Sequence, residues 1–448
     1  MHSSDPGGAL WIPRPFPGHC RSGLMMTNLA RNLARIALVG AGGSHPATLA
    51  AVEGALARVS PETPVTVVDM SLFDRRGVAR YEGFKSEVLR LRPADFGLRE
   101  IFRTAGPNLI ISGGARRFEQ MIDAFGKLLE EQSVGAMLIC HSRGFPEQAM
   151  IAAASRAGLK VAQIDEGPFS MPVRPATAPE FSNRKQKLVF GGLRRLGLVP
   201  RRDLIGGKVD RFFITSPGRG RVALERGLDP AKLAVVPCPR FDALAALREK
   251  WRDRVRASET KRVLFLHQPF RADRKLDRAE ADRAELLLMH GLSELAQKRP
   301  IRLGIRMHPR SDEAERARVA DRFSPLADVL ALSDGTSLTD DLISADGFVG
   351  FYSSALLEAA VCGAPVAAVR LKAESFAQHD EAIKAANLSE LGLAVFEEAP
   401  ALAAFLDDKL GSGEMAPPTA LIEEQIGDVR LHGSDEVARQ LMALLQGR

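Results

Sequence analysis

The sequence predicts an α/β protein built from two doubly wound parallel sheets. Short apolar segments alternate with amphipathic segments along most of the chain, as strands and helices do in a parallel sheet. The alternation occurs in two series, which a basic stretch between residues 184 and 202 separates. A length of 448 residues is also long for one domain and natural for two, each large enough to bury its own core.

The first series begins with an apolar strand at Arg35–Val39. Residues 1–34 have a Gly7-Gly8 pair, three prolines between Pro13 and Pro17 and no periodic apolar face, so we expect a disordered extension before it. Amphipathic periodicity predicts helices at Phe118–Gln132 and Glu147–Ala157. The further predicted strands of this series are Val65–Val68, Asn108–Ser112, Ala136–Cys140 and Lys160–Ile164.

The second series follows the basic stretch and contains seven predicted strands. These strands are Arg211–Thr215, Ala234–Val236, Arg262–His267, Ile301–Met307, Val329–Leu332, Gly347–Phe351 and Pro365–Val369. We therefore predict two Rossmann-like domains, at residues 35–205 and 206–428, followed by a C-terminal helix at 429–448.

Composition excludes several classes of protein. Apolar residues make up 45% of the chain and charged residues 26%, and no apolar run approaches the roughly 20 residues that span a bilayer. A net charge of +6 is small for this length, and aromatic residues are only 6%, so we expect no nucleic-acid partner. The four cysteines form no C-x-x-C pair, which suits a reducing cytoplasm without disulfides or structural zinc.

The basic stretch itself has two interpretations. Seven basic and no acidic residues lie between Arg184 and Arg202, interleaved with leucine, valine and phenylalanine. Such a segment could lie peripherally on the anionic cytoplasmic face of the inner membrane. The alternative is a solvated helix between domains, although Gly191, Gly192 and Gly197 weaken any continuous helix.

A phosphate-binding site is predicted where a helix starts at Ser353 and Ser354, directly after a strand. The first N–H groups of a helix lack intrahelical acceptors, and they attract anions together with the serine hydroxyls. The segment Arg306-Met-His-Pro-Arg310 ends another strand at the same sheet edge. Glu358, one turn into the helix, could reach a ribose hydroxyl or face solvent. The predicted nucleotide-binding residues are Arg306, His308, Pro309, Arg310, Ser353, Ser354 and Glu358.

A catalytic carboxylate is predicted in the first series at Asp165-Glu166-Gly167, directly after a strand. Successive side chains diverge there, so one of the two carboxylates can face a ligand and accept a proton from an attacking hydroxyl. The alternative role of this tripeptide is a helix cap or a surface turn.

Other strand ends carry polar groups that could line the same cleft. Gly42 and Gly43 follow the first strand in Gly40-Ala-Gly-Gly-Ser-His45, which lacks the third glycine of a dinucleotide fingerprint, so we expect no nicotinamide cofactor. His141 and His267 each follow a strand and could contact a ligand, or they could be hydrogen-bonded loop histidines. No metal-ligand spacing is present, so we predict metal-independent chemistry.

These motifs, in this order, resemble those of bacterial GT-B glycosyltransferases that use CMP-activated acidic sugars in surface polysaccharide synthesis, such as sialic acid and Kdo-type transferases. Phe213-Ile-Thr-Ser-Pro-Gly218 also looks like the entrance to their nucleotide domain, whereas Pro237-Cys238 replaces the usual Gly-Asn. The resemblance implies two domains facing a central cleft, an acceptor domain first and a nucleotide-sugar domain second. It implies Asp165 as the base, with Glu166 as second candidate, and His308, Ser353 and Ser354 at the phosphate.

We therefore predict a glycosyltransferase that moves a sugar from a nucleotide-sugar donor, CMP-linked by this resemblance, to a glycan, glycolipid or protein acceptor. Two alternatives stay open. One is a UDP-sugar 2-epimerase or a CDP-glycerol-type transferase on the same fold, and the other is a non-catalytic protein that binds nucleotide sugars.

Overall fold

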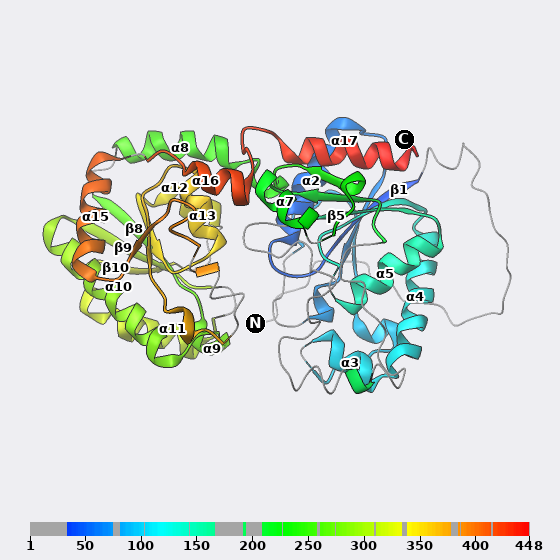
Figure 1. Ribbon diagram of the computed structural model, residues 1–448, viewed down its shortest axis with the longest axis horizontal. Coiled ribbons are helices and arrows are strands. Elements are labelled where there is room, and N and C mark those ends of the chain that lie inside the picture. Colours follow the sequence, from blue (N-terminus) through cyan, green and yellow to red (C-terminus); the bar gives the residue numbers. More distant parts are fainter. Residues whose placement is uncertain are drawn as a thin grey trace, which may run out of the picture. The chain divides into compact units, whose positions relative to one another are not determined.

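The computed structural model describes residues 34–74, 81–102, 104–142, 144–165, 191–193, 208–225, 227–257, 260–273, 275–308, 311–333, 338–377, 384–385, 387–413 and 415–447. Within these ranges the chain forms two compact units. Residues up to 242 and from 431 onward form the first unit, and residues 243–430 form the second. Each unit is built around one parallel sheet (Figure 1).

The sheet of the first unit has seven parallel strands in the order β3-β2-β1-β4-β5-β6-β7. The strands are β1 (Arg35–Gly40), β2 (Val65–Asp69), β3 (Val88–Arg90), β4 (Val134–Ile139), β5 (Lys160–Ile164), β6 (Arg211–Ile214) and β7 (Leu233–Val235). The order reverses between β1 and β4, which lie side by side with Val39 paired to Ile139. At such a reversal the connections leave in opposite directions and open a crevice at the carboxyl ends of the strands.

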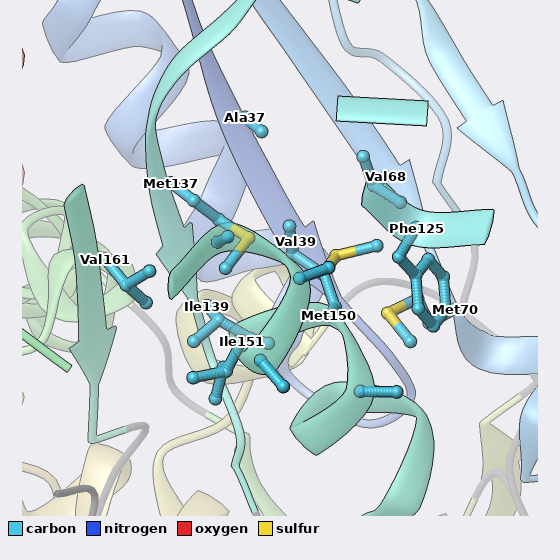
Figure 2. Packing of buried hydrophobic residues seen from close by; sticks show 14 of the residues in the cluster. Ala37, Val39, Val68, Met70, Phe125, Met137, Ile139, Met150, Ile151 and Val161 are labelled. Atoms are coloured by element: carbon cyan, nitrogen blue, oxygen red, sulfur yellow. The ribbon is translucent and has the colours of Figure 1, made fainter. Parts of the chain in front are cut away.

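Alternating side chains of this sheet bury both of its faces. Ala37 and Val39 contribute to one apolar cluster with helices α4 (Gly114–Glu131) and α5 (Phe145–Arg156), as Figure 2 shows. Ile36 and Leu38 contribute to the opposite cluster with α2 (His45–Val59) and α17 (Gly433–Leu445). A strand that is buried on both faces is a continuous apolar run in the sequence, and most strands of this sheet could be predicted for that reason.

The sheet of the second unit has six parallel strands in the order β10-β9-β8-β11-β12-β13. The strands are β8 (Lys261–Leu266), β9 (Ile301–Arg306), β10 (Leu330–Ser333), β11 (Gly347–Gly350), β12 (Val366–Val369) and β13 (Ala394–Phe396). The order reverses between β8 and β11, where Phe265 pairs with Val349. The two sheets therefore share one topology.

Helices cover both faces of the second sheet. Helix α10 (Arg278–Lys298) contacts α15 (Ala399–Ser412), and α8 (Leu244–Ala257) contacts α12 (Leu338–Ser344) and α13 (Ser354–Val361). Further helices in the described ranges are α3 (Ala105–Ile111), α7 (Pro217–Glu225), α9 (Phe270–Asp273), α11 (Glu313–Arg322) and α16 (Thr419–Leu421). No helix in the described ranges is both long enough and apolar enough to cross a bilayer.

The predicted fold class, two Rossmann-like parallel α/β domains, is confirmed. One predicted strand was wrong: Asn108–Ser112 lies in and just after helix α3, because a short apolar run does not distinguish the two structures. The Asn108 side chain also bonds both backbone groups of Phe102, which favours a turn before the helix. Strands β3 and β13, of three residues each, were not predicted.

The structure divides the chain differently from the predicted boundary at 205 and 206. Strands β6 and β7 extend the first sheet, because Phe213 pairs with Ile164 and Ala234 with Phe213. The C-terminal helix α17 also belongs to the first unit, where it contacts α2 (Figure 1). Residues 1–33 and most of the basic stretch lie outside the described residues, so the predictions for them stay predictions.

Candidate functional site

The candidate nucleotide site of the second unit lies at the reversal between β8 and β11. Gln268, just after β8, bonds both backbone groups of Tyr352, just after β11: the Tyr352 N–H donates to Gln268 Oε1 at 3.0 Å, and Gln268 Nε2 donates to the Tyr352 carbonyl. Phe270 stacks on the Tyr352 ring with the centroids 5.5 Å apart. These contacts fix the backbone directly before helix α13.

Helix α13 begins as predicted. Ser353 is its N-cap, with extended backbone, and the Ser353 hydroxyl accepts a hydrogen bond from the Leu356 N–H at 3.2 Å. Ser354 is the first helical residue and is half-buried. The first-turn N–H groups other than that of Leu356 have no acceptor within the helix, and the helix dipole adds positive potential there. This helix end can hold an anionic group.

The strand end at β9 carries the other predicted phosphate residues. His308 is half-buried two residues after β9, next to β8 in the sheet. The Arg306 guanidinium forms an ion pair with Asp341 of α12, so its charge is already balanced by a carboxylate. Pro309 and Arg310 lie outside the described residues. Phosphate contacts of these four residues stay predictions.

Glu358 lies in α13 and is only 6% exposed. The alternative of a solvent-facing glutamate was therefore wrong, and contact with a ribose stays a prediction. The thiol of Cys362, one turn further along, is buried, and burial with the nearby Glu358 charge raises its pKa to about 12. Cys362 is thus not a nucleophile at neutral pH, and Cys140 and Cys238 are likewise buried free thiols.

His267 belongs to a buried ionic cluster, whose other members were missing from the predicted site. Its Nε2 lies 3.3 Å from a carboxylate oxygen of Glu315 and 3.9 Å from one of Glu285. Arg318 donates to Glu285 at 2.6 and 2.8 Å and to Glu315 at 2.8 and 3.0 Å. His267 and Arg318 together lower the pKa of Glu315 to about 2.

Three side chains of this cluster, among the described residues, lie close enough together to bind a metal ion. One ligand atom each from His267, Glu285 and Glu315 lies within 4.8 Å of the others. The guanidinium of Arg318, however, already binds both carboxylates and supplies the positive charge that a metal would bring. The donor set therefore fits a buried salt bridge better than a metal centre, and metal-independent chemistry stays a prediction.

The reversal in the first unit, between β1 and β4, brings two histidines together. The His45 Nδ1 accepts a hydrogen bond from the Ala41 N–H at 2.8 Å, and Tyr81 donates to the Ala41 carbonyl at 2.9 Å. Gly42 and Gly43 form the turn between these groups, and Gly43 has a positive φ of 72°. The His141 ring, just after β4, has its centroid 6.3 Å from that of His45.

His141 pairs with Glu147, which the sequence did not single out. The His141 Nδ1 lies 3.7 Å from Glu147 Oε1, with 39% of the His141 side chain exposed and 11% of the Glu147 side chain. Glu147 lies in the first turn of α5 and so points toward the carboxyl end of β4. A half-exposed imidazole beside a buried carboxylate is an arrangement that general acid–base catalysis uses. The spacing of six residues across a glycine and a proline was the available signal.

Asp165 follows β5 directly and is buried, with 4% exposed. Its Oδ2 accepts a hydrogen bond from Arg219 Nε at 2.6 Å, and Arg219 is equally buried at the start of α7. The alternative of a surface turn was therefore wrong for Asp165. Its role as a base stays a prediction, and a proton transfer there has to compete with the Arg219 contact. Glu166 lies outside the described residues.

No protein-family model matches this chain, and no curated protein matches it in sequence. Solved structures do match its fold. The UDP-GlcNAc 2-epimerase from Methanocaldococcus jannaschii superposes with a TM-score of 0.56 at 13% identity, over 91% of this chain and 99% of that one. A UDP-N-acetylglucosamine 2-epimerase from Listeria monocytogenes gives 0.57 at 16% identity, over 92% and 96%.

A wall teichoic acid polymerase, TagF, soaked with CDPG, also matches, with a TM-score of 0.51 at 11% identity over 93% of this chain and 90% of that one. At such low identity these comparisons establish architecture only. The chain is thus similar to nucleotide-sugar enzymes of GT-B-like fold along nearly its whole length, and the two parallel α/β units described above are that fold.

Proposed function

We propose that this protein is an enzyme that acts on a sugar or polyol linked to a nucleoside monophosphate or diphosphate, and that the second unit binds the nucleotide. The observation that carries the proposal is the N-terminus of α13, where hydrogen bonds fix the backbone. Gln268 fixes the backbone of Tyr352 by hydrogen bonds. Ser353 caps α13, whose first N–H groups lie where the strand order reverses between β8 and β11. Diphosphates bind where helix N-termini meet such reversals.

The reaction that we place first is 2-epimerisation of a UDP-linked sugar. UDP-GlcNAc 2-epimerases share the fold over 96 to 99% of their own chains. Inverting the configuration at C2 breaks a C–H bond and returns a proton to the opposite face, so it needs groups that accept and donate protons. His141 with Glu147 is the acid–base pair that we propose in the first unit, and Asp165 is the second candidate there.

The second candidate is transfer of a group from a CDP-linked or CMP-linked donor, including the CMP-activated acidic sugar that the sequence motifs suggest. The placement of Asp165 directly after β5 favours it, because transfer needs a base for the acceptor hydroxyl at a sheet edge. The fold likeness to TagF is consistent with this reaction. In both reactions the anionic phosphate of the donor would lie at α13, as a diphosphate in UDP- and CDP-linked donors and as a single phosphate in a CMP-linked donor.

One experiment separates these reactions. The protein is incubated in D2O with UDP-GlcNAc, CDP-glycerol or a CMP-linked acidic sugar, each with and without a lipid and glycan extract as acceptor, and followed by NMR. Deuterium at C2 of the sugar without nucleotide release indicates epimerisation, whereas nucleotide release that depends on the extract indicates transfer. If no donor reacts and no nucleotide raises the Tm, the proposed function is wrong.

Variants then assign the acid–base groups. We expect His141→Gln and Asp165→Asn each to lower kcat about a hundredfold, because a positioned acid or base contributes roughly that factor. Nucleotide binding should persist, with a ligand at a hundred times its Kd adding about 2.7 kcal/mol to the folded state. His290→Gln, at an exposed histidine of α10, is the control and should behave as wild type. Treatment with EDTA should leave the activity unchanged.

A further inference from the structure

Two adjacent apolar side chains of the first unit point into solvent. Ile101 is 68% exposed and Phe102 is 46% exposed, and Ile101 is the most exposed large apolar side chain of the described residues. We refer to this pair as the apolar tip. Single exposed apolar residues are ordinary on protein surfaces, but adjacent aliphatic and aromatic side chains on one loop form a patch.

The apolar tip is held outward by hydrogen bonds of its own loop. The Phe102 N–H donates to Asn108 Oδ1 at 2.8 Å, and Asn108 Nδ2 donates back to the Phe102 carbonyl at 2.8 Å. The Ser112 hydroxyl accepts from the Arg99 N–H at 2.8 Å. Asn108 is itself buried, so the tip is fixed to the body of the unit. A preorganised loop loses little conformational entropy when it binds a partner.

The sequence on either side of the apolar tip carries more positive than negative charge. Arg99 and Arg116 are exposed on either side of it in the sequence, and Arg117 donates to the Ser112 carbonyl at 3.2 Å. Glu100 is the only acidic residue among the described positions 97–117. An apolar projection with arginines around it is complementary to a surface that is apolar inside and anionic at its boundary.

The topology places the apolar tip at a definite edge of the first sheet. The tip follows the carboxyl end of β3, and α4 then runs back toward the start of β4. Segments that follow strands lie at the carboxyl edge, which is also the edge of His141 and Asp165. Helix α3, next to the tip, lies at the periphery of this unit in Figure 1.

We propose that the apolar tip inserts into the headgroup region of an anionic lipid bilayer and attaches the first unit to it. Ile101 and Phe102 would enter the acyl boundary while Arg99 and Arg116 contact the phosphates. A protein partner would require a complementary pocket and some 800 Å² on each side, whereas a bilayer accepts a two-residue projection without one. This attachment is independent of the reaction and does not involve the basic stretch at 184–202.

The test is sedimentation of the full chain with vesicles of phosphatidylglycerol and phosphatidylcholine, and with pure phosphatidylcholine. We expect binding to the anionic vesicles that weakens with salt. Ile101→Ser with Phe102→Ser should reduce the partition coefficient roughly tenfold, because two apolar anchors are lost. Arg99→Glu should also reduce it. The controls are Leu286→Ser and Lys250→Glu, at exposed positions of α10 and α8, and they should bind as wild type.

Insertion has a second readout. A tryptophan introduced by Phe102→Trp should be quenched by brominated acyl chains, whereas one introduced by Leu286→Trp should not. The proposal is overturned if the wild type does not bind anionic vesicles, or if the Ile101→Ser, Phe102→Ser variant keeps its Tm and binds as tightly as Leu286→Ser. It is also overturned if the tryptophan at position 102 is not quenched in vesicle-bound protein. None of these outcomes depends on enzymatic activity.

Discussion

Asp165 and Arg219 form a buried ion pair, with side chains 3% and 5% exposed. Removing one partner leaves an uncompensated charge inside the protein. We expect Arg219→Leu to lower the free energy of unfolding by roughly 3 to 5 kcal/mol. Arg156→Leu is the control, because Arg156 and Glu119 are both more than half exposed, and should cost less than about 1 kcal/mol. Urea titrations measure both, and equal costs would contradict the prediction.

Glu315 makes the free energy of unfolding of the second unit depend on pH in the acidic range. Its pKa is about 2 in the folded state against 4.5 unfolded, first because of His267 and then because of Arg318. The folded state therefore binds fewer protons, so this contribution, about 3 kcal/mol, is complete above pH 4.5 and is lost as the pH falls toward 2. In Glu315→Gln the free energy of unfolding should lack this part of its pH dependence. Glu313→Gln, at an exposed position of the same turn, should keep it. Urea titrations between pH 2 and 6 distinguish them.

At the scale of elements, two helix starts depend on particular backbone contacts. Asp242 accepts hydrogen bonds from the N–H groups of Gly433 and Ser434 at 2.8 and 3.0 Å and so caps α17. A Cβ at Gly433 would lie 2.0 Å from the Pro237 carbonyl oxygen. We expect Gly433→Ala to cost roughly 1 to 3 kcal/mol through this clash. The measurement is the midpoint of thermal unfolding.

The matched control is Gly126→Ala in the middle of α4, where a Cβ would meet nothing within 4 Å. That change should stabilise the protein by up to about 1 kcal/mol, because alanine is the better helix former. Destabilisation of similar size at both positions would show that the Pro237 contact is not the cause.

Helix α13 gives a prediction for the proposed nucleotide site. Ser353→Ala removes the hydroxyl that accepts from the Leu356 N–H and should cost about 1 kcal/mol of stability. Since the same hydroxyl lies at the proposed anion site, the Tm shift on adding UDP or CDP should also fall. Ser412→Ala is the control, at the C-terminal end of α15, and should leave the nucleotide shift unchanged. An undiminished shift in Ser353→Ala would remove Ser353 from the proposed site.

At the scale of the whole molecule, the chain leaves the first unit after residue 242 and returns at 431. The returning helix α17 buries Val437, Ala438 and Leu441 in the core of the first unit. We expect Leu441→Ala to lower the free energy of unfolding by roughly 2 to 5 kcal/mol, as truncation of a buried leucine does. Leu431→Ala, at a residue 59% exposed, should be neutral. Equal denaturation midpoints for the two variants would mean that the first unit folds without α17.

Much of the fold follows from local patterns. The runs at Arg35–Gly40 and Val134–Ile139 are apolar at consecutive positions, which a strand buried on both faces requires, and the serine pair at Ser353 gave the start of α13. The three-residue strands β3 and β13 were missed, because so few residues carry little pattern, although β7, of the same length, was predicted. Asn108 shows the opposite case, because its side chain bonds to the Phe102 backbone stabilise a turn that the apolar run does not reveal.

Local sequence patterns were enough to predict parallel α/β architecture and the strand ends that carry Asp165, His141, His308 and Ser353, because buried strands and helix caps depend on neighbouring residues. Only the tertiary structure decided that β6, β7 and α17 complete the first unit, that Arg219 binds Asp165, that Glu147 approaches His141, and that Arg318 joins Glu285 and Glu315 around His267. Strand order and ion pairing depend on which segments meet in space. The six-residue spacing of His141 and Glu147 permits their contact but does not specify it.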